Sequence, residues 1–251
     1  SLSATGANPF GVFQIGESSG KPVLTNPRDT AVCSGSNAGF TSIPEATSAP
    51  YQSINWQRSI DGTNWVDISA NLDAGTLYSG FTTQNLILTG TSNAINNYKY
   101  RAAATNVNGV TYTNPATITI RNSPAIVTQP IATAAVCSGT GVQKIYVKAS
   151  GYGLTYTWRK SGIVLSNGGV FSGQGTDTLF LTQPTSSNDG YYSVIVGGGC
   201  VPSVTSNNIY VSIKRLPTIS GSASNSRCDT GRVLITAVAS TGADVQWYNT
   251  P

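Results

Sequence analysis

The side chains that carry most enzyme chemistry are scarce in this chain of 251 residues, which contains no histidine and only ten carboxylates. Without histidine, Ser-His-Asp and Cys-His nucleophile–base pairs and every histidine-ligated metal site are excluded. No close pair of carboxylates resembles the acid and nucleophile of a glycosidase, and no phosphate-binding Gly-x-x-x-x-Gly-Lys-Ser/Thr loop or dinucleotide-binding fingerprint is present. We therefore expect no enzyme activity, no catalytic residue, no metal site and no cofactor.

One loop does offer oxygen ligands. Asp61-Gly-Thr-Asn64 and the nearby Asp67 carry the carboxylate and amide oxygens that Ca²⁺ prefers. The same residues also fit a solvated hairpin loop, because Asp-Gly is a common turn sequence, and this is the interpretation that we favour. Trp65, directly after the loop, is a candidate surface contact that can present an aromatic face to a sugar, but packing beneath the hairpin is the interpretation that we favour.

The composition is that of an extracellular β-protein whose solvent face carries hydroxyl and amide groups. Only 10% of the residues are charged, while 27 are glycine and 12 are tyrosine. Tyr112, Tyr146 and Tyr210 are expected on outward strand faces, where they would supply adhesive contact area, although strand propensity explains them equally well.

The net charge of +4 is spread without a basic run, so nucleic-acid binding is not expected. No apolar stretch approaches the ~18–20 residues of a membrane helix, and the first residues lack a signal-peptide pattern.

The candidate side chains named above must be positioned by β-strands, and the stretch 137–213 shows the pattern that predicts those strands. Trp158 lies in the middle of an alternating strand, and Tyr192 follows the turn Asp189-Gly190. A Trp at such a position lies across the core between two sheets, and a Tyr after an Asp-Gly turn matches the corner tyrosine of immunoglobulin-like (Ig-like) sandwiches. The facing strand is expected to bury Val142, Ile145 and Val147.

The same landmarks recur along the chain. A Cys beside a glycine-containing turn, followed by a Trp in an alternating strand, appears three times at intervals of 89 to 104 residues, which indicates repeated domains. We predict an all-β fold of tandem Ig-like β-sandwiches arranged as an extended rod, since the proline-containing joints are short and stiff. The expected parts are an N-terminal arm or the end of a preceding domain (1–21), domain 1 (22–121), domain 2 (122–214) and the start of a truncated domain 3 (215–251). The expected structural core contains Trp56, Trp158, Trp247, Tyr100 and Tyr192. Because the sequence stops just after a core Trp, we expect it to be a piece of a longer polypeptide.

The four cysteines are consistent with a protein of an oxidising compartment, where disulfides form and persist. Cys137 and Cys200 bracket domain 2, and we predict that they form a disulfide, which stabilises a small secreted domain by about 2–4 kcal/mol; two buried free thiols are the alternative. Cys228 begins the third repeat, and its partner would lie beyond the end of the sequence. Domain 1 has no cysteine at the position equivalent to Cys200, so Cys33 is expected to be unpaired.

Several motifs carry a family resemblance. Trp-Gln-x-Ser-x-Asp-Gly-x-x-Trp-x-x-Ile at 56–68 is followed by Leu-x-Leu-Thr at 86–89 and Tyr-x-Tyr-Arg at 98–101. Together with Cys33-Ser-Gly, this pattern resembles the Ig-like repeats of large cell-surface proteins of Bacteroidetes, over roughly 22–251. Proteins built from such repeats are commonly exported by the type 9 secretion system and act as adhesins, including the mobile adhesins of gliding bacteria.

The resemblance has two further implications. Thr30 and Thr178 stand in Asp-Thr-aliphatic sequences, the O-glycosylation pattern of this bacterial group, although so short a motif arises easily by chance. Animal Ig domains join strands B and F by a disulfide, whereas apolar residues are expected at those positions here. They are Phe40 and Ala102 in domain 1, and Val147 and Val194 in domain 2.

The resemblance thus implies a non-catalytic segment of a large adhesin, secreted or held on the outer face of the outer membrane, whose glycan or protein ligand the sequence does not name. Tandem modules would act multivalently. One alternative is a spacer in a large secreted hydrolase. Another is a docked component of the export or motility machinery, and Phe10 and Phe13 in the N-terminal arm are candidate contacts for such outer-membrane partners.

Overall fold

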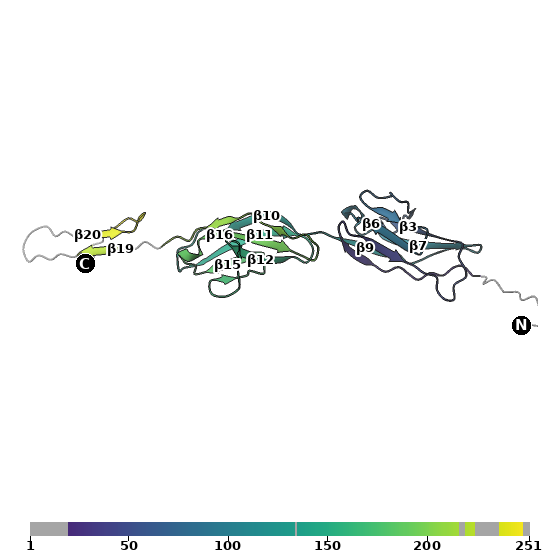
Figure 1. Ribbon diagram of the computed structural model, residues 1–251, viewed down its shortest axis with the longest axis horizontal. Coiled ribbons are helices and arrows are strands. Elements are labelled where there is room, and N and C mark those ends of the chain that lie inside the picture. The colour runs from purple at the N-terminus through teal and green to yellow at the C-terminus, as the bar shows by residue number, and fades with distance from the viewer. Residues whose placement is uncertain (1–19, 134, 216–218, 224–235, 248–251) are drawn as a thin grey trace, which may run out of the picture. The chain divides into compact units, whose positions relative to one another are not determined.

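The computed structural model describes residues 20–133, 135–215, 219–223 and 236–247, with side chains except at 221–223. The chain divides into two compact units, Ser1–Asn122 and Ser123–Pro251. Their described residues form β-strands (Figure 1). They also include two single-turn 3₁₀ helices, η1 (Asn93–Ile95) and η2 (Ser186–Asn188). The predicted all-β fold is confirmed.

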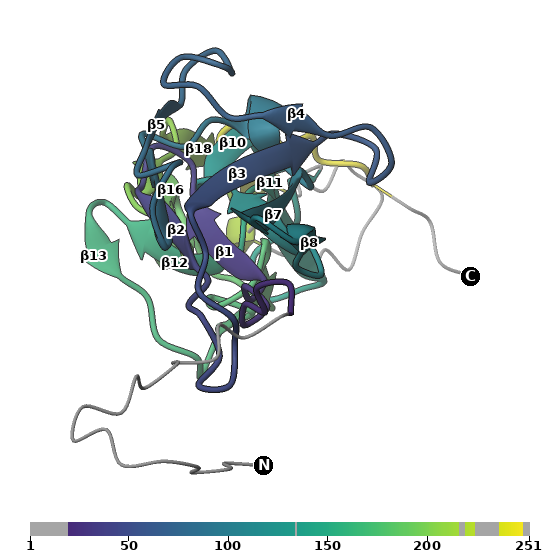
Figure 2. The same ribbon diagram turned by 90° about the vertical axis from the view of Figure 1, so that its right-hand side faces the viewer.

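The first unit contains two sheets. One has the strand order β1-β9-β7-β3-β4, with β8 also paired to β7, and the other has the order β2-β6-β5. Figure 2 labels β3, β7 and β8 of the first sheet, which lie side by side. The strands of the first sheet are β1 (Thr30–Cys33), β3 (Ser53–Ser59), β4 (Val66–Asp67), β7 (Lys99–Asn106), β8 (Gly109–Tyr112) and β9 (Ala116–Arg121). Those of the second are β2 (Ala38–Thr41), β5 (Leu77–Ser79) and β6 (Asn85–Thr89).

The core of this unit lies between the two sheets, around Trp56 and Tyr100, which are both fully buried. Phe40 stacks on Tyr100 with ring centroids 4.8 Å apart, and Ala102 is also fully buried. Phe40 and Ala102 are the apolar residues predicted at the positions where animal Ig domains carry a disulfide. In this unit, aromatic and apolar packing therefore joins the sheets there.

The second unit repeats this plan with a different first strand. Its sheets have the orders β10-β11-β15-β14 and β13-β12-β16-β17, with β18 also paired to β16. Whereas β1 pairs in parallel with the last strand of its unit, β10 pairs antiparallel with β11. The strands of the first sheet are β10 (Ala125–Ala132), β11 (Val142–Ser150), β14 (Phe171–Ser172) and β15 (Thr178–Thr182). Those of the second are β12 (Thr155–Lys160), β13 (Ile163–Val164), β16 (Gly190–Gly197), β17 (Val204–Thr205) and β18 (Ile209–Val211).

The core of the second unit is built around Trp158 and Tyr192, both fully buried. The Tyr192 hydroxyl donates to the backbone carbonyl of Asn188 at 2.7 Å, which is the corner contact of an Ig-like sandwich. One facing residue was wrongly predicted: Val142 is 42% exposed, and Gln143 is buried in its place. Strand alternation requires this, since Ile145 is buried and residues two apart share a face.

The predicted Cys137–Cys200 disulfide is wrong, because Cys137 is an exposed free thiol. Cys137 pairs in a parallel bridge with Lys214, beyond the Gly190 end of β16, whereas Cys200 follows the opposite end of that strand. An eight-residue strand spans about 25 Å, far more than the ~7 Å between Cα atoms that a disulfide allows.

The expectation for Cys33 is also wrong, because Cys33 and Cys200 are each disulfide-bonded. The missing counterpart of Cys200 in domain 1 removes only one conceivable partner and does not make Cys33 free. Cys228 lies outside the described residues.

Trp247 was expected in a core but is 61% exposed. In the described part of the third repeat, the strands are β19 (Ile219–Ala223) and β20 (Thr236–Ala239), which form a two-stranded antiparallel ribbon. A burial site for Trp in an Ig-like sandwich needs two facing sheets, and the described residues here supply one ribbon.

Candidate interaction face

The outer surface of the sheet β8-β7-β3-β4 carries a group of side chains that contact one another. Along β7, Tyr100 and Ala102 point into the core, so Arg101 between them points outward. The register places Gln57 of β3 opposite both Arg101 and Asp67 of β4. We call this surface the Arg101 face; it comprises Asn55, Gln57, Trp65, Asp67, Arg101 and Tyr112.

The Arg101 guanidinium is held between two aromatic rings. Its central carbon lies 4.2 Å from the ring centroid of Trp65 and 4.1 Å from that of Tyr112. Arg101 Nε donates to Gln57 Oε1 at 2.9 Å, and Gln57 Nε2 donates to Asp67 Oδ1 at 2.8 Å. These contacts fix the plane of the guanidinium, since both rings stack on it and its Nε is already bonded.

The positive charge of Arg101 has no carboxylate partner among the described residues. No described carboxylate lies within ion-pair distance, and its two terminal nitrogens, Nη1 and Nη2, have no hydrogen-bond acceptor among the described residues. Partial burial lowers the pKa of Arg101, and the Tyr112 phenol opposes this shift. Arginine nevertheless stays protonated at neutral pH, so the face presents a rigid cation with two free donor groups.

The acidic loop next to this face is a hairpin turn. The Asp61 carboxylate accepts hydrogen bonds from the backbone N–H groups of Thr63 and Asn64, each at 2.8 Å, and from the side chains of Asn64 and Ser59. These donors, the Asn64 backbone N–H first, lower the pKa of Asp61. Because its carboxylate is bonded within the turn and Asp67 is bonded to Gln57, the loop does not gather free oxygens for Ca²⁺. Nor do the described residues contain any group of three or more His, Cys, Asp or Glu side chains suited to a metal ion.

The second unit carries a related surface on its sheet β13-β12-β16-β18. Tyr191 and Tyr210 stand opposite each other, each 55% exposed, in an edge-to-face contact with ring centroids 5.1 Å apart. Arg159 lies opposite Ser193 in the neighbouring strand. Its Nε is buried and has no hydrogen-bond partner. In each unit, an arginine and aromatic rings therefore lie on the outer surface of one sheet: β8-β7-β3-β4 in the first unit and β13-β12-β16-β18 in the second.

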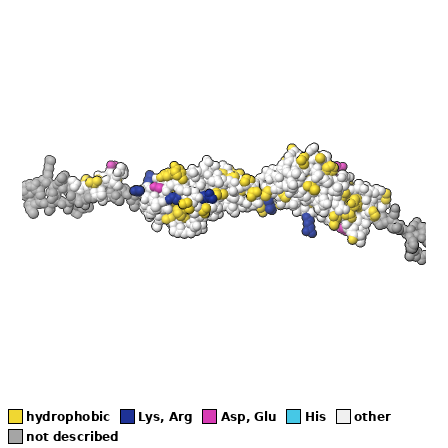
Figure 3. All heavy atoms as spheres, in the orientation of Figure 1, with side chains coloured by type: hydrophobic (Ala, Val, Ile, Leu, Met, Phe, Trp, Pro, Cys, Tyr) yellow, Lys and Arg dark blue, Asp and Glu magenta, His cyan; other side chains and the backbone are white. Residues whose placement is uncertain are grey.

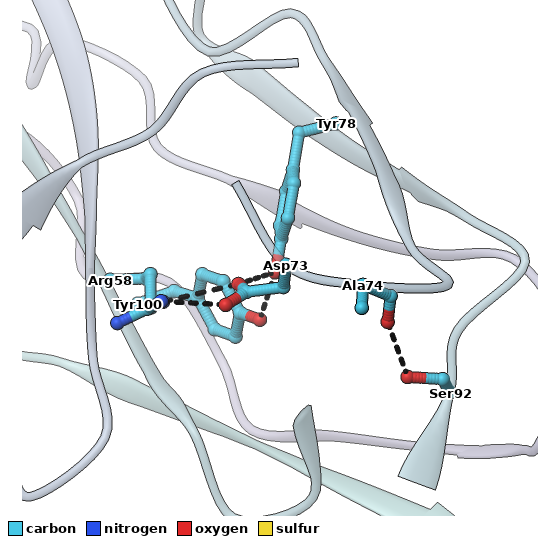
Figure 4. A network of polar contacts seen from close by, with 6 residues as sticks. All are labelled: Arg58, Asp73, Ala74, Tyr78, Ser92 and Tyr100. Atoms are coloured by element: carbon cyan, nitrogen blue, oxygen red, sulfur yellow. Dashed lines mark hydrogen bonds and ion pairs between the residues drawn. The ribbon is translucent and has the colours of Figure 1, made fainter. Parts of the chain in front are cut away.

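Sequence reasoning missed a buried polar network in the first unit (Figure 4). Arg58 forms an ion pair with Asp73 at 2.6 Å, and the Tyr78 hydroxyl donates to the same carboxylate at 2.7 Å. The Tyr78 and Tyr100 hydroxyls are 3.0 Å apart, and burial raises the pKa of both phenols. Because every one of these groups has a partner in the core, we assign the network to stability rather than to binding.

A repeated turn that anchors the two core indoles was also missed. Trp56 Nε1 donates to the Thr83 carbonyl and Trp158 Nε1 to the Thr176 carbonyl, both at 2.9 Å. Each threonine hydroxyl also donates back to the carbonyl of a glycine three residues earlier, Gly80 or Gly173. The signal was present in the sequence, because Ser-Gly-x-x-Thr occurs at 79–83 and at 172–176.

The remaining candidates are dispersed. Thr30 in β1 and Thr178 in β15 are half-buried, and the Thr178 hydroxyl donates to Asp177 at 2.9 Å. Tyr146 is half-buried on β11. Phe10 and Phe13 lie outside the described residues. Charged side chains are sparse on the face shown in Figure 3, as the composition implies.

Comparison with known proteins identifies the fold. No family model and no curated protein matches the chain. Among solved structures, the I-band fragment I67–I69 from titin is similar with a TM-score of 0.55 and 14% identity, over 79% of this chain and 67% of that fragment. Sidekick-1 immunoglobulin domains 1–4 are similar with a TM-score of 0.51 and 16% identity, over 77% of this chain and 48% of theirs. The chain thus spans about two thirds and about half of these structures, and at such identities the likeness shows the Ig-like fold alone.

Within the described ranges, no helix has the length and apolar character needed to cross a membrane.

Proposed function

We propose that this chain is a non-catalytic, adhesive segment of a secreted or cell-surface bacterial protein, with tandem Ig-like modules as its contact units. The observation that carries the proposal is the Arg101 face, where an arginine stacked between Trp65 and Tyr112 stands on the outside of a sheet. Tyr and Trp supply rigid, amphipathic contact area at low entropic cost, and arginine is enriched with them at binding hot spots.

The resemblance to Bacteroidetes repeats extends the proposal. It favours export by the type 9 secretion system, display at the outer face of the outer membrane, and a role in attachment that includes gliding motility. The aromatic pair Tyr191 and Tyr210, together with Arg159, gives the second unit a related surface. Linked weak sites of this kind raise avidity without any single strong contact.

Adhesion under multivalent display tests this function. Beads coated with the full 251-residue chain should be retained under flow on immobilised polysaccharides or extracellular proteins. The double substitution Trp65→Ala and Tyr112→Ala should release most of them, because it removes both rings of the stack. Ile87→Ala, at an exposed apolar residue of β6 on the other sheet of the first unit, is the control and should leave retention unchanged. Coated beads that bind none of these surfaces would favour the spacer role instead.

A further inference from the structure

The Arg101 face has one polar group that is oriented but unsatisfied. The rings of Trp65 and Tyr112 fix the guanidinium plane, and Gln57 occupies Nε. The edge that carries Nη1 and Nη2 has no acceptor among the described residues. A planar guanidinium edge matches a carboxylate in a two-point hydrogen-bonded pair, the strongest geometry for this ion pair. Since the arginine is already ordered, little side-chain entropy is lost when a carboxylate binds.

We infer that Arg101 binds the carboxylate of an acidic polysaccharide, with Trp65 and Tyr112 packing against the sugar. This inference rests on the proposed adhesive function and names its ligand class. Tyr112 is 49% exposed, so it offers ring surface to the apolar C–H groups of a sugar while it contacts Arg101. Each uronate unit of such a polymer carries one carboxylate beside several hydroxyl groups.

The neighbouring polar groups favour a glycan over an acidic peptide. Asp67 accepts from Gln57 through Oδ1, and its Oδ2 has no partner among the described residues. A free carboxylate oxygen accepts hydrogen bonds from the hydroxyl groups that flank a uronate carboxylate, whereas the side chains of an acidic peptide carry no hydroxyl group beside theirs. Asn55 is exposed on β3 and lies opposite Ala103, which itself lies opposite Tyr112 in the next strand. Its amide adds a donor and an acceptor for hydroxyl groups in line with Tyr112.

The direct test is the affinity of the full chain for a fluorescent oligogalacturonate, measured by anisotropy. Arg101→Gln should weaken binding about tenfold or more, because it removes the charge and the two-point donor edge. Arg101→Lys keeps the charge but loses the planar edge, so it should weaken binding severalfold. Arg28→Gln, at an exposed arginine outside this face, is the matched control and should leave the affinity unchanged. The methyl-esterified oligomer, which lacks carboxylate charge, should bind wild type as weakly as the acidic oligomer binds Arg101→Gln.

A measurement without substitution covers the case in which Arg101→Gln unfolds the first unit. The side-chain Nε–H resonance of Arg101 in ¹⁵N-labelled wild type should shift with oligogalacturonate and not with its methyl ester. Equal binding of acid and ester, or equal losses in Arg101→Gln and Arg28→Gln, would overturn the inference. Tighter binding of oligoglutamate through Arg101 would overturn the glycan assignment. If beads coated with Arg101→Gln are retained as well as wild type, this inference is wrong but the proposed function stands. If beads coated with the wild-type chain are retained on no surface, the proposed function is wrong.

Discussion

Replacing Gly80 by alanine should destabilise the first unit through the turn that anchors Trp56. Gly80 has a φ of +68°, and a Cβ added there would lie 2.1 Å from the backbone oxygen of Asn85. Such a contact is impossible, so the turn must move. Movement separates the Thr83 carbonyl from the Trp56 indole N–H, which it now accepts at 2.9 Å.

The expected cost has two parts. An alanine in the left-handed region costs about 1–2 kcal/mol. A fully buried indole N–H that loses its acceptor costs about 1–3 kcal/mol more. The total is about 2–5 kcal/mol. Gly35 is the matched control, because its φ is +84° and an added Cβ meets no atom within 4 Å. Gly35→Ala should therefore cost only the first part.

Urea unfolding followed by tryptophan fluorescence measures both variants, and hydrogen exchange of the β6 and β7 amides assigns the transition to the first unit. The equivalent pair in the second unit is Gly173, whose Cβ would lie 2.3 Å from the Thr178 oxygen, and Gly139, which has open space. Equal losses for Gly80→Ala and Gly35→Ala would refute the anchoring role of the turn, since only backbone conformation would then matter.

Three further expectations concern the core, the cysteines and the acidic loop. Trp158→Ala should destabilise the second unit by about 3–5 kcal/mol because it leaves a large cavity, whereas Trp247→Ala should change the melting temperature little; similar shifts would contradict the burial described above. Iodoacetamide should label Cys137 without prior reduction and should reach Cys33 and Cys200 only after reduction, as peptide mapping would show. The pKa of Asp61 is held below its ordinary value of 3.8, so its contribution to stability is present above about pH 4 and fades at lower pH. Asp61→Asn should accordingly lower the melting temperature at pH 7, by an amount that shrinks below about pH 4; a constant difference would argue against the charge.

The fold class was predictable because its strongest signals are local. Trp56 and Trp158 stand in strands of alternating apolar residues, and Tyr192 follows an Asp-Gly turn. The residues directly before and after each of them are therefore enough to predict that its side chain is buried between two sheets. The error at Val142 arose where hydrophobicity was preferred to strand period. Gln143 occupies the inward position. Its amide nitrogen donates to the Thr133 carbonyl at 2.9 Å and to the Thr133 hydroxyl at 3.0 Å, which offsets part of the cost of burial, while its buried Oε1 has no hydrogen-bond partner.

The cysteine assignment failed for a non-local reason. Sequence spacing shows that Cys137 and Cys200 bracket one sandwich, but it does not show at which end of the sandwich each lies. That depends on strand register, which places Cys137 beside Lys214 and Cys200 beyond the other end of β16. The network around Asp73 was missed for the same reason, because Arg58, Tyr78 and Tyr100 come from three different strands.

The motif that carries the family resemblance and the surface that would bind a ligand overlap only in part. Within the motif, Trp56 and Ile68 are buried, and Asp61 closes the hairpin turn. Trp65 and Arg101 are also motif residues, and their stack holds the hairpin against β7. Tyr112 lies outside the motif, on β8, and it supplies the second ring that leaves only one edge of the guanidinium open. If repeats of this kind differ in ligand, residues such as Tyr112 are where the difference should lie, because they can change without disturbing the hairpin.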